Sequence, residues 1–496
     1  MKQKYVALDL ETTGLTPEFD EIIEVGAVKF QDDQVIDTFQ AIVNPQRSLN
    51  YRIKLLCGIE QSQLDAAPSF AEIAEGLRNF IEECAIVGHN IAFDLGFLAQ
   101  KGIKPAGHAY DTWELATVLL FKQPDYSLAS LTRQLGISSP EHRALPDALA
   151  TKDLFLALRE RALQLDRSTI EKLVNLAEAA YWDVAHFFRD VLQTKVKTAF
   201  TDSDDTTLSE RKDGVGLWDE EGKRSLVRRS DSVPLDIDSL VEMIGPDGVL
   251  NEALPGYEHR LGQIQMMREI ARSFNQGEHL IVEAGTGTGK SIAYLLPSIS
   301  FAVENNVPVV VSTNTINLQD QLVGKDIPDL VHALQRVNES LADNLRVMQL
   351  KGRTNYLCMR KYENLMASAR LSIEEVKLLS RITVWLLSTE SGDRAELNLA
   401  GNELATWNRL CAQFDERGEG QCAHRLRGAC FLHSARRAAE ESHIIVVNHA
   451  LLLSDMVSDT KILPPYEHLI IDEAHHLEDE ATDQLGYVIT QWDVLA

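Results

Sequence analysis

Two sets of residues suited to phosphate chemistry constrain what this chain of 496 residues can fold into. One set lies within residues 9–147 and consists of carboxylates and a histidine. The other lies within residues 284–473 and combines a glycine-rich segment with an acidic pair. Members of both sets follow short apolar runs of the kind that form buried strands. This pattern predicts two α/β domains with functional side chains at the ends of strands.

The composition, with 45% apolar and 25% charged residues, is typical of a soluble globular protein. The length favours two or three domains. No apolar run approaches the ~18 residues of a membrane span, so we expect no membrane partner. Six cysteines without an export signal favour reduced thiols or metal ligands and a cytoplasmic location. The net charge of −26 argues against nonspecific coating of nucleic acid, but it is compatible with an enzyme that holds phosphates locally.

Residues 1–165 are expected to form the first domain. Apolar alternation predicts strands over residues 5–10, 22–30 and 35–43, joined by short polar turns as in antiparallel hairpins. The remaining predicted elements are a strand over 85–88 and helices over 70–83, 112–121, 128–135 and 145–163. Together they predict a mixed sheet flanked by helices.

Residues 166–245 are expected to be a helical and charged linker, with an amphipathic helix over 167–194 and a polar stretch over 200–232. Residues 246–496 change to strand–turn–helix units. Buried parallel strands are predicted over 280–283, 309–312, 444–448 and 469–472. A helix-rich, cysteine-bearing insertion over 352–438 interrupts this second domain.

The N-terminal carboxylates have the spacing of a metal site. Asp9 and Glu11 are two residues apart at the end of a strand, so their side chains leave the same face. Asp94 follows another strand, and Asp147 lies five residues after His142. Four converging carboxylates would repel one another unless cations neutralised them. We therefore predict that the four acids bind two Mg²⁺ or Mn²⁺ ions for phosphodiester cleavage, with His142 as the general base.

This arrangement resembles the DEDDh exonucleases, the DnaQ-like superfamily with an RNase H-like fold. The resemblance covers roughly residues 1–160 and rests on residues 9–15, 22–27, 89–94 and 142–147. It implies 3′→5′ removal of nucleotides from single-stranded ends. It also implies that a short loop meets the terminal nucleotide, formed by Thr13, Gly14 and Leu15. We expect Asn90 to have a structural role.

The glycine-rich segment predicts an ATP site. It consists of Ala284, Gly285, Thr286, Gly287, Thr288, Gly289, Lys290 and Ser291. Glycines let backbone amides turn toward phosphate oxygens at a helix N-terminus. We predict that Lys290 bridges the β- and γ-phosphates of ATP and that Ser291 ligates its Mg²⁺. Asp472 would hold the same Mg²⁺, and Glu473 would polarise the attacking water.

Residues 472–475 read Asp-Glu-Ala-His, the signature of superfamily 2 helicases. Other segments resemble the DinG/XPD branch of these RecA-like motors, including residues 447–452. The resemblance implies that Arg260 and Gln263 form a motif that reads adenine. It also implies that residues 312–322 contact the DNA backbone, through Thr313, Thr315 and Gln319.

A DnaQ-like nuclease joined to a DinG-type helicase is a known arrangement in Gram-positive bacteria, so the resemblance spans nearly the whole chain. It implies an exonuclease with an ATP-dependent DNA helicase motor, acting in DNA repair or replication. Single-stranded DNA, 3′ ends and forked DNA are the expected partners, together with ATP.

Four cysteines lie between the glycine-rich segment and the acidic pair, namely Cys358, Cys411, Cys422 and Cys430. The DinG/XPD resemblance implies that they ligate a [4Fe–4S] cluster. A zinc site is less favoured because no pair shows the close spacing of zinc ligands. Four inert thiols are the remaining alternative.

The chain stops at Ala496, shortly after the acidic pair. The resemblance implies a second RecA-like domain that is missing here, so we expect a truncated product or a fragment. One alternative hypothesis is an exonuclease whose ATP-binding domain gates cleavage without translocating. Another is a non-catalytic DNA-binding or scaffold protein, against which the intact set of metal ligands argues.

Overall fold

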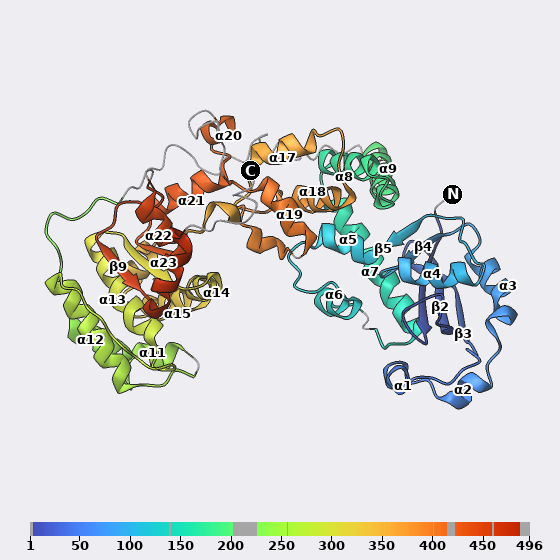
Figure 1. The fold of residues 1–496 in the computed structure, drawn as a ribbon, viewed down its shortest axis with the longest axis horizontal. Helices are drawn as coiled ribbons and strands as arrows, with labels where there is room; N and C mark the ends of the chain where they lie inside the picture. Colours follow the sequence, from blue (N-terminus) through green and yellow to red (C-terminus); the bar gives the residue numbers. More distant parts are fainter. Residues whose placement is uncertain are drawn as a thin grey trace. The chain divides into compact units, whose positions relative to one another are not determined.

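The computed structural model describes residues 3–137, 140–201, 226–254, 256–399, 401–413, 422–458 and 461–486. Packing divides the chain into two compact units, whose elements are drawn in Figure 1. Unit 1 comprises residues 1–211 and 360–410, and unit 2 comprises residues 212–359 and 411–496. Most of the stretch over 200–232 that was predicted as a solvated linker lies outside the described residues.

Unit 1 is built on a five-stranded mixed sheet of order β3-β2-β1-β4-β5. Its strands are β1 (Tyr5–Thr12), β2 (Ile22–Gln31), β3 (Gln34–Ile42), β4 (Ala85–Gly88) and β5 (Ala109–Asp111). The first three strands pair antiparallel, whereas β4 runs parallel to β1, and β5 runs parallel to β4. The predicted mixed sheet is therefore confirmed.

Helices cover both faces of this sheet. Those of residues 1–211 are α1 (Tyr51–Cys57), α2 (Gln61–Asp65), α3 (Phe70–Ile81), α4 (Ala92–Gln100), α5 (Thr112–Leu119), α6 (Leu128–Leu135), α7 (Ala144–Gln164), α8 (Arg167–Ala179) and α9 (Val184–Thr201). The α3 and α4 helices share an apolar core with one face, and α7 packs on β1 and β2. Three further helices of unit 1 come from residues 359–410: α17 (Met359–Met366), α18 (Ile373–Trp385) and α19 (Asn402–Leu410).

The alternation of side chains along β1 decides which face carries its acids. Val6 and Leu8 enter the core that contains α3 and α4. Tyr5 points the other way, and its ring centroid lies 5.2 Å from that of Phe155 in α7. Asp9 and Glu11 are in step with Tyr5, so they also face α7.

Unit 2 contains a four-stranded sheet of order β7-β8-β6-β9, in which every pairing is parallel. The strands are β6 (Val309–Thr313), β7 (Val347–Gln349), β8 (Ile444–Asn448) and β9 (His468–Ile471). The helices are α10 (Ile237–Ile244), α11 (Val249–Ala253), α12 (Leu261–Gln276), α13 (Lys290–Asn305), α14 (Ile316–Gln321), α15 (Ile327–Gln335), α16 (Glu339–Asn344), α20 (Ala423–Leu426), α21 (Phe431–Glu440), α22 (His449–Val457) and α23 (Leu477–Leu485). The predicted parallel sheet is confirmed.

Two predicted elements are wrong in detail. The single helix over 167–194 is instead α8 and α9, separated where Tyr181 adopts a left-handed backbone with φ +52°. Residues 280–283 do not form a strand, and Ile281 is fully exposed. Within the described parts of the chain, β9 pairs with β6 alone and is therefore an edge strand of the sheet.

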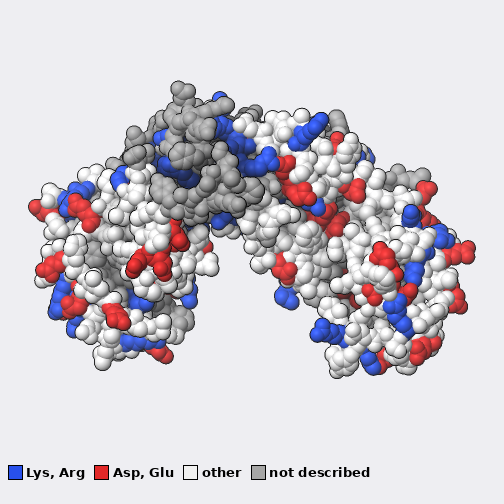
Figure 2. All heavy atoms as spheres, viewed as in Figure 1, with Lys and Arg blue, Asp and Glu red and all other residues white. Residues whose placement is uncertain are grey.

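The distribution of charged side chains and the apolarity of the helices are those expected from the composition. On the face shown in Figure 2, acidic and basic side chains are interspersed over both units. None of the helices in the described ranges is both long enough and apolar enough to cross a bilayer.

Candidate active sites

Three carboxylates converge where β1 meets the first turn of α7. Asp9 and Glu11 come from β1, and Asp147 comes from α7. Each offers an oxygen atom, and these atoms lie within 4.8 Å of one another. Asp147 also lies at the helix N-terminus, where the backbone dipole favours a negative charge.

The fourth predicted ligand, Asp94, is buried in α4 beside this group. Its Oδ1 accepts the backbone N–H of Leu10 at 3.0 Å, which ties α4 to β1 between the two acids of that strand. Oδ1 of Asp147 accepts the N–H of Glu141 at 2.8 Å. Backbone donors therefore fix two of the four side chains.

Burial raises the pKa of every carboxyl in this cluster, and repulsion by neighbouring acids raises it further for Asp9, Glu11 and Asp94. Burial, and then repulsion by Asp94 and Asp147, raises the pKa of Asp9 well above its ordinary value. Burial and then the Asp147 charge raise the pKa of Glu11 to about 7, and burial raises that of Asp94 to about 8. Burial also raises the pKa of Asp147. Oxygen ligands that resist ionisation unless neutralised fit divalent cations such as Mg²⁺ or Mn²⁺.

The predicted general base, His142, is exposed beside Asp147 and has a left-handed backbone with φ +55°. Burial raises the pKa of Asp147, and the proximity of His142 partly offsets this effect. The structure thus brings His142 and the four predicted acids to one region of unit 1.

An ion pair that the sequence did not predict anchors the segment with His142. Glu24 in β2 is fully buried and accepts two hydrogen bonds from Arg143, at 2.8 Å from Nε and 2.7 Å from Nη2. It also accepts the N–H of Ala144 at 3.2 Å. Burial alone would raise the pKa of Glu24, but these bonds lower it below its ordinary value. The available signal is a single acidic residue within the apolar first half of the strand.

The loop after β1 carries the three residues expected to meet a terminal nucleotide. The N–H of Thr13 donates to Glu21 O at 2.8 Å, and the hydroxyl of Thr12 donates to Gly14 O at 2.7 Å. A Cβ on Gly14 would lie 2.4 Å from an Asp20 carboxylate oxygen, so a larger residue here would displace the Asp20 side chain. Leu15 is 83% exposed and therefore accessible to a ligand.

Hydrogen bonds to β5 and α5 hold the segment that follows β4. Asn90 has φ +62°, and its N–H donates to Asp111 Oδ1 at 2.9 Å, which agrees with a structural role. Nδ1 of His89 hydrogen-bonds Thr112 Oγ1 at 2.9 Å. Burial lowers the pKa of His89 to about 4, so this ring is neutral near pH 7.

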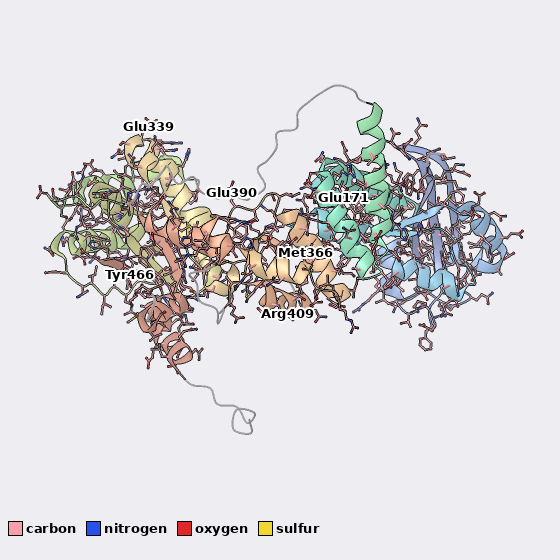
Figure 3. All side chains as sticks on the ribbon, turned by 90° about the horizontal axis from the view of Figure 1, so that it is seen from above. Glu171, Glu339, Met366, Glu390, Arg409 and Tyr466 are labelled. Carbon is pink, nitrogen blue, oxygen red and sulfur yellow. The ribbon has the colours of Figure 1, made fainter. Side chains whose placement is uncertain are left out.

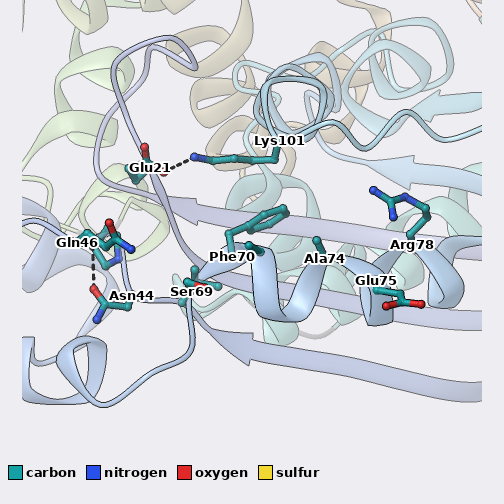
Figure 4. Close-up of a pocket in the computed structure, with 12 residues that line it drawn as sticks. Glu21, Asn44, Gln46, Ser69, Phe70, Ala74, Glu75, Arg78 and Lys101 are labelled. Carbon is teal, nitrogen blue, oxygen red and sulfur yellow. Dashed lines mark hydrogen bonds and ion pairs between the residues drawn. The ribbon is translucent and has the colours of Figure 1, made fainter.

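A separate pocket of about 620 Å³ lies between the start of α3 and the end of α4 (Figure 4). Lys101 forms an ion pair with Glu21 across it, and Phe70 and Arg78 contribute to its wall. None of the four clustered acids lines this pocket.

In unit 2, the glycine-rich segment leads into α13, which begins at Lys290 after Gly289 with φ +83°. Lys290 Nζ donates to Glu473 Oε1 at 2.7 Å, and this bond raises the pKa of Lys290 and lowers that of Glu473. Asp472 Oδ2 accepts Tyr294 OH at 3.0 Å. The structure therefore brings the acidic pair, which follows β9, to the N-terminal turns of α13.

The other predicted ATP contacts are held close to the glycine-rich segment. Gln263 Nε2 donates to Gly289 O at 3.0 Å, and Arg260 donates to Gly287 O. Residues 284–291 are partly or fully exposed.

The three residues of unit 2 that were predicted to contact DNA differ in their exposure to solvent. Thr313 and Gln319 are fully buried, and Gln319 Nε2 donates to Val446 O at 3.3 Å. Thr315 is exposed and caps α14, because its Oγ1 accepts Leu318 N–H at 3.2 Å.

The four cysteines expected at a cluster all belong to unit 2 and form no disulfide. Cys358, Cys422 and Cys430 are half-buried, and Cys411 is buried. Burial raises the pKa of Cys430, and the nearby Cys358 and Cys422 thiols raise it further. Leu357 and Cys411 form an isolated antiparallel bridge.

Comparisons with known proteins agree with this division. Residues 6–155 match the family model described as Exonuclease, and residues 261–357 match the one described as DEAD/DEAH box helicase. The chain is 32% identical over 98% of its length to the 3′-5′ exonuclease DinG of Bacillus subtilis, of which it covers 51%. It is 28% identical over 99% of its length to the 3′-5′ exonuclease DinG of Staphylococcus aureus (strain MRSA252), of which it covers 52%. The chain thus spans about half the length of these curated relatives.

Among solved structures, Exonuclease X in complex with 5′ overhanging duplex DNA is similar to part of the chain. It has 22% sequence identity and a TM-score of 0.28, and the match covers 32% of this chain and 91% of that one.

The raised carboxyl pKa values predict how the metal-free protein responds to pH. The pKa of Asp94 is about 8 in the fold, above the ordinary value of about 3.9, so its stabilising contribution is complete below about pH 4 and is lost as the pH rises through 8. Without metal, Asp94→Asn should therefore raise the melting temperature at pH 8 by at least about 2 °C, the shift expected per kcal/mol. Differential scanning calorimetry measures this effect.

The matched control is Asp33→Asn, an exposed carboxylate in the β2–β3 turn that should leave the melting temperature unchanged. If Asp94→Asn melts below the wild type at pH 8 without metal, repulsion in the cluster is not significant.

Proposed function

We propose that this chain, a homologue of the DinG 3′-5′ exonucleases over nearly its whole length, removes nucleotides from the 3′ ends of single-stranded DNA. The observation that carries the proposal is the convergence of Asp9, Glu11 and Asp147 within 4.8 Å, beside Asp94, in a buried site that raises their pKa values. A structural role would not need four acids that oppose one another's ionisation.

The four carboxylates would hold two Mg²⁺ or Mn²⁺ ions. When bound, such ions supply an activated water and neutralise charge on the leaving oxygen. His142 would accept the proton of the attacking water, and its exposure leaves room for that water. Leu15, with Thr13 and Gly14, would pack against the terminal nucleotide, because its exposed side chain offers an apolar face beside the acids.

We further propose that unit 2 binds ATP with Mg²⁺ as part of a DinG-type helicase motor acting on forked DNA in repair or replication. The match to the DEAD/DEAH box helicase model and the contact between Lys290 and Glu473 support this role. Lys290, which donates to Glu473, would contact the β- and γ-phosphates of bound ATP. Ser291 and Asp472 would hold the Mg²⁺, and Arg260 and Gln263 would contact the adenine.

A [4Fe–4S] cluster on Cys358, Cys411, Cys422 and Cys430 is a finer proposal about the same unit. It is supported by the electrostatic proximity of three of these thiols and by the backbone bridge at Cys411. Iron analysis of an anaerobic preparation tests it, and a colourless, iron-free protein would exclude the cluster.

The nuclease proposal predicts that Asp9→Ala abolishes the Mn²⁺-dependent shortening of a 5′-labelled single-stranded oligonucleotide. His142→Gln should slow the single-turnover rate by about 10²–10⁴-fold, the usual contribution of a general base. Asp33→Ala serves as the control with full activity. Undiminished cleavage by Asp9→Ala would refute the assignment of this residue as a metal ligand.

The ATP proposal predicts that Lys290→Ala weakens the binding of Mg²⁺-ATP by about 10- to 150-fold, which corresponds to the ~1.5–3 kcal/mol of a charged hydrogen bond. Calorimetric titration measures the dissociation constant. Arg336→Ala, an exposed cation at the end of α15, is the matched control. Equal affinities of the Lys290 variant and the wild type would contradict the predicted phosphate contact.

A further inference from the structure

Residues 360–410 belong to unit 1, although the chain on both sides of them belongs to unit 2. This segment, which we call the arm, lies outside both family matches. Its central helix α18 packs against α5 and α8. Figure 3 shows the arm, labelled at Met366 and Arg409, beside α8, labelled at Glu171.

One set of contacts joins α18 to α5. Lys377 Nζ lies 2.6 Å from Glu114 Oε1, and Trp182 Nε1 donates to Glu114 Oε2 at 2.7 Å. Lys377 also lies 5.7 Å from the centre of the Trp182 ring. Glu114 thus has a partner on each side, one from the arm and one from the turn between α8 and α9.

A second set joins α18 to the loop between α5 and α6. The side chain of Arg381 is only 4% exposed. Its Nη2 donates to Phe121 O at 3.0 Å and to Tyr126 OH at 3.3 Å. Asn398 of the arm donates to Gln123 O at 3.2 Å. A buried guanidinium with fixed partners holds this loop in one conformation.

The loop leads directly to the acidic cluster. The backbone of Tyr126 hydrogen-bonds the ring of His89. His89 in turn bonds Thr112, and Thr112 Oγ1 donates to Gly88 O at 3.1 Å. The next helix along the chain is α4, which carries Asp94. A series of hydrogen bonds, which passes through the covalent frame of Tyr126, therefore connects Arg381 with the segment that precedes α4.

We propose that Arg381 is a positioning residue for the nuclease site, supplied by the arm that interrupts the ATP-binding region. It holds the loop over residues 120–127 against His89 and so keeps Asp94 at the distance that metal binding requires. This inference rests on the proposed nuclease function. A segment beyond the exonuclease match would therefore support the nuclease site, and the chain on both sides of this segment belongs to unit 2.

The test measures the Mn²⁺ dependence of single-stranded DNA cleavage by the whole chain. Arg381→Ala should raise the Mn²⁺ concentration for half-maximal activity by about 10-fold or more, as loss of support for metal ligands does. Arg381→Lys should reverse part of this shift, because lysine keeps the positive charge but lacks the paired N–H donors of the guanidinium. The control is Arg370→Ala, an exposed cation of the same arm. A merely structural role would lower the amount of active protein and leave the metal midpoint unchanged.

Asn398→Ala is the milder second variant if Arg381→Ala fails to fold, and it should shift the midpoint in the same direction. Calorimetric Mn²⁺ binding and hydrogen exchange over residues 88–94 and 120–127 need no turnover, so they separate this inference from the proposed function. Weaker binding and faster exchange in the arm variants support the inference even if the wild type cleaves no DNA. Unchanged metal affinity and exchange in folded arm variants would overturn it.

Discussion

Electrostatic repulsion among four carboxylates is the constraint on which the architecture of unit 1 depends. Asp9 and Glu11 reach the same face because β1 alternates, and α7 adds Asp147 to that face. Asp94 of α4 lies beside them, where it accepts the N–H of Leu10. Without a cation, each acid raises the free energy of ionising its neighbours. The fold tolerates this arrangement because a large apolar core on the opposite face fixes β1 and α4.

Oppositely charged groups hold the surroundings of both sites. The ion pair of buried Glu24 with half-buried Arg143 binds the start of α7 to β2, and a Cβ on Gly26 would collide with the backbone of Ala144. The segment that carries His142 thus packs closely against the sheet. In unit 2, Lys290 and Glu473 similarly join two segments far apart in sequence. The arm adds Arg381, a buried cation from a segment that lies outside both family matches.

The sequence predicted those features that depend on local periodicity. β4, α6 and β8 have the predicted limits, and the acids at 9, 11 and 147 lie together with Asp94 beside them. Short elements such as α2 and β7 were missed because a few residues carry too little periodicity to be recognised. The contact of Glu24 with Arg143 and the packing of the arm join residues more than 100 positions apart, so no local pattern indicates them. The burial of Thr313 and Gln319 likewise depends on how β6 lies within its sheet.

The central claim is that the acids of unit 1 hold protons until divalent cations replace them. Calorimetric titration of Mn²⁺ at pH 7, in buffers with different ionisation enthalpies, counts the protons released on binding. With the pKa of Glu11 at about 7 and that of Asp94 at about 8, the account predicts release of about one proton or more per chain, and less release as the pH rises above 8. Binding of Mn²⁺ without proton release, or no binding to the wild-type chain, would contradict it.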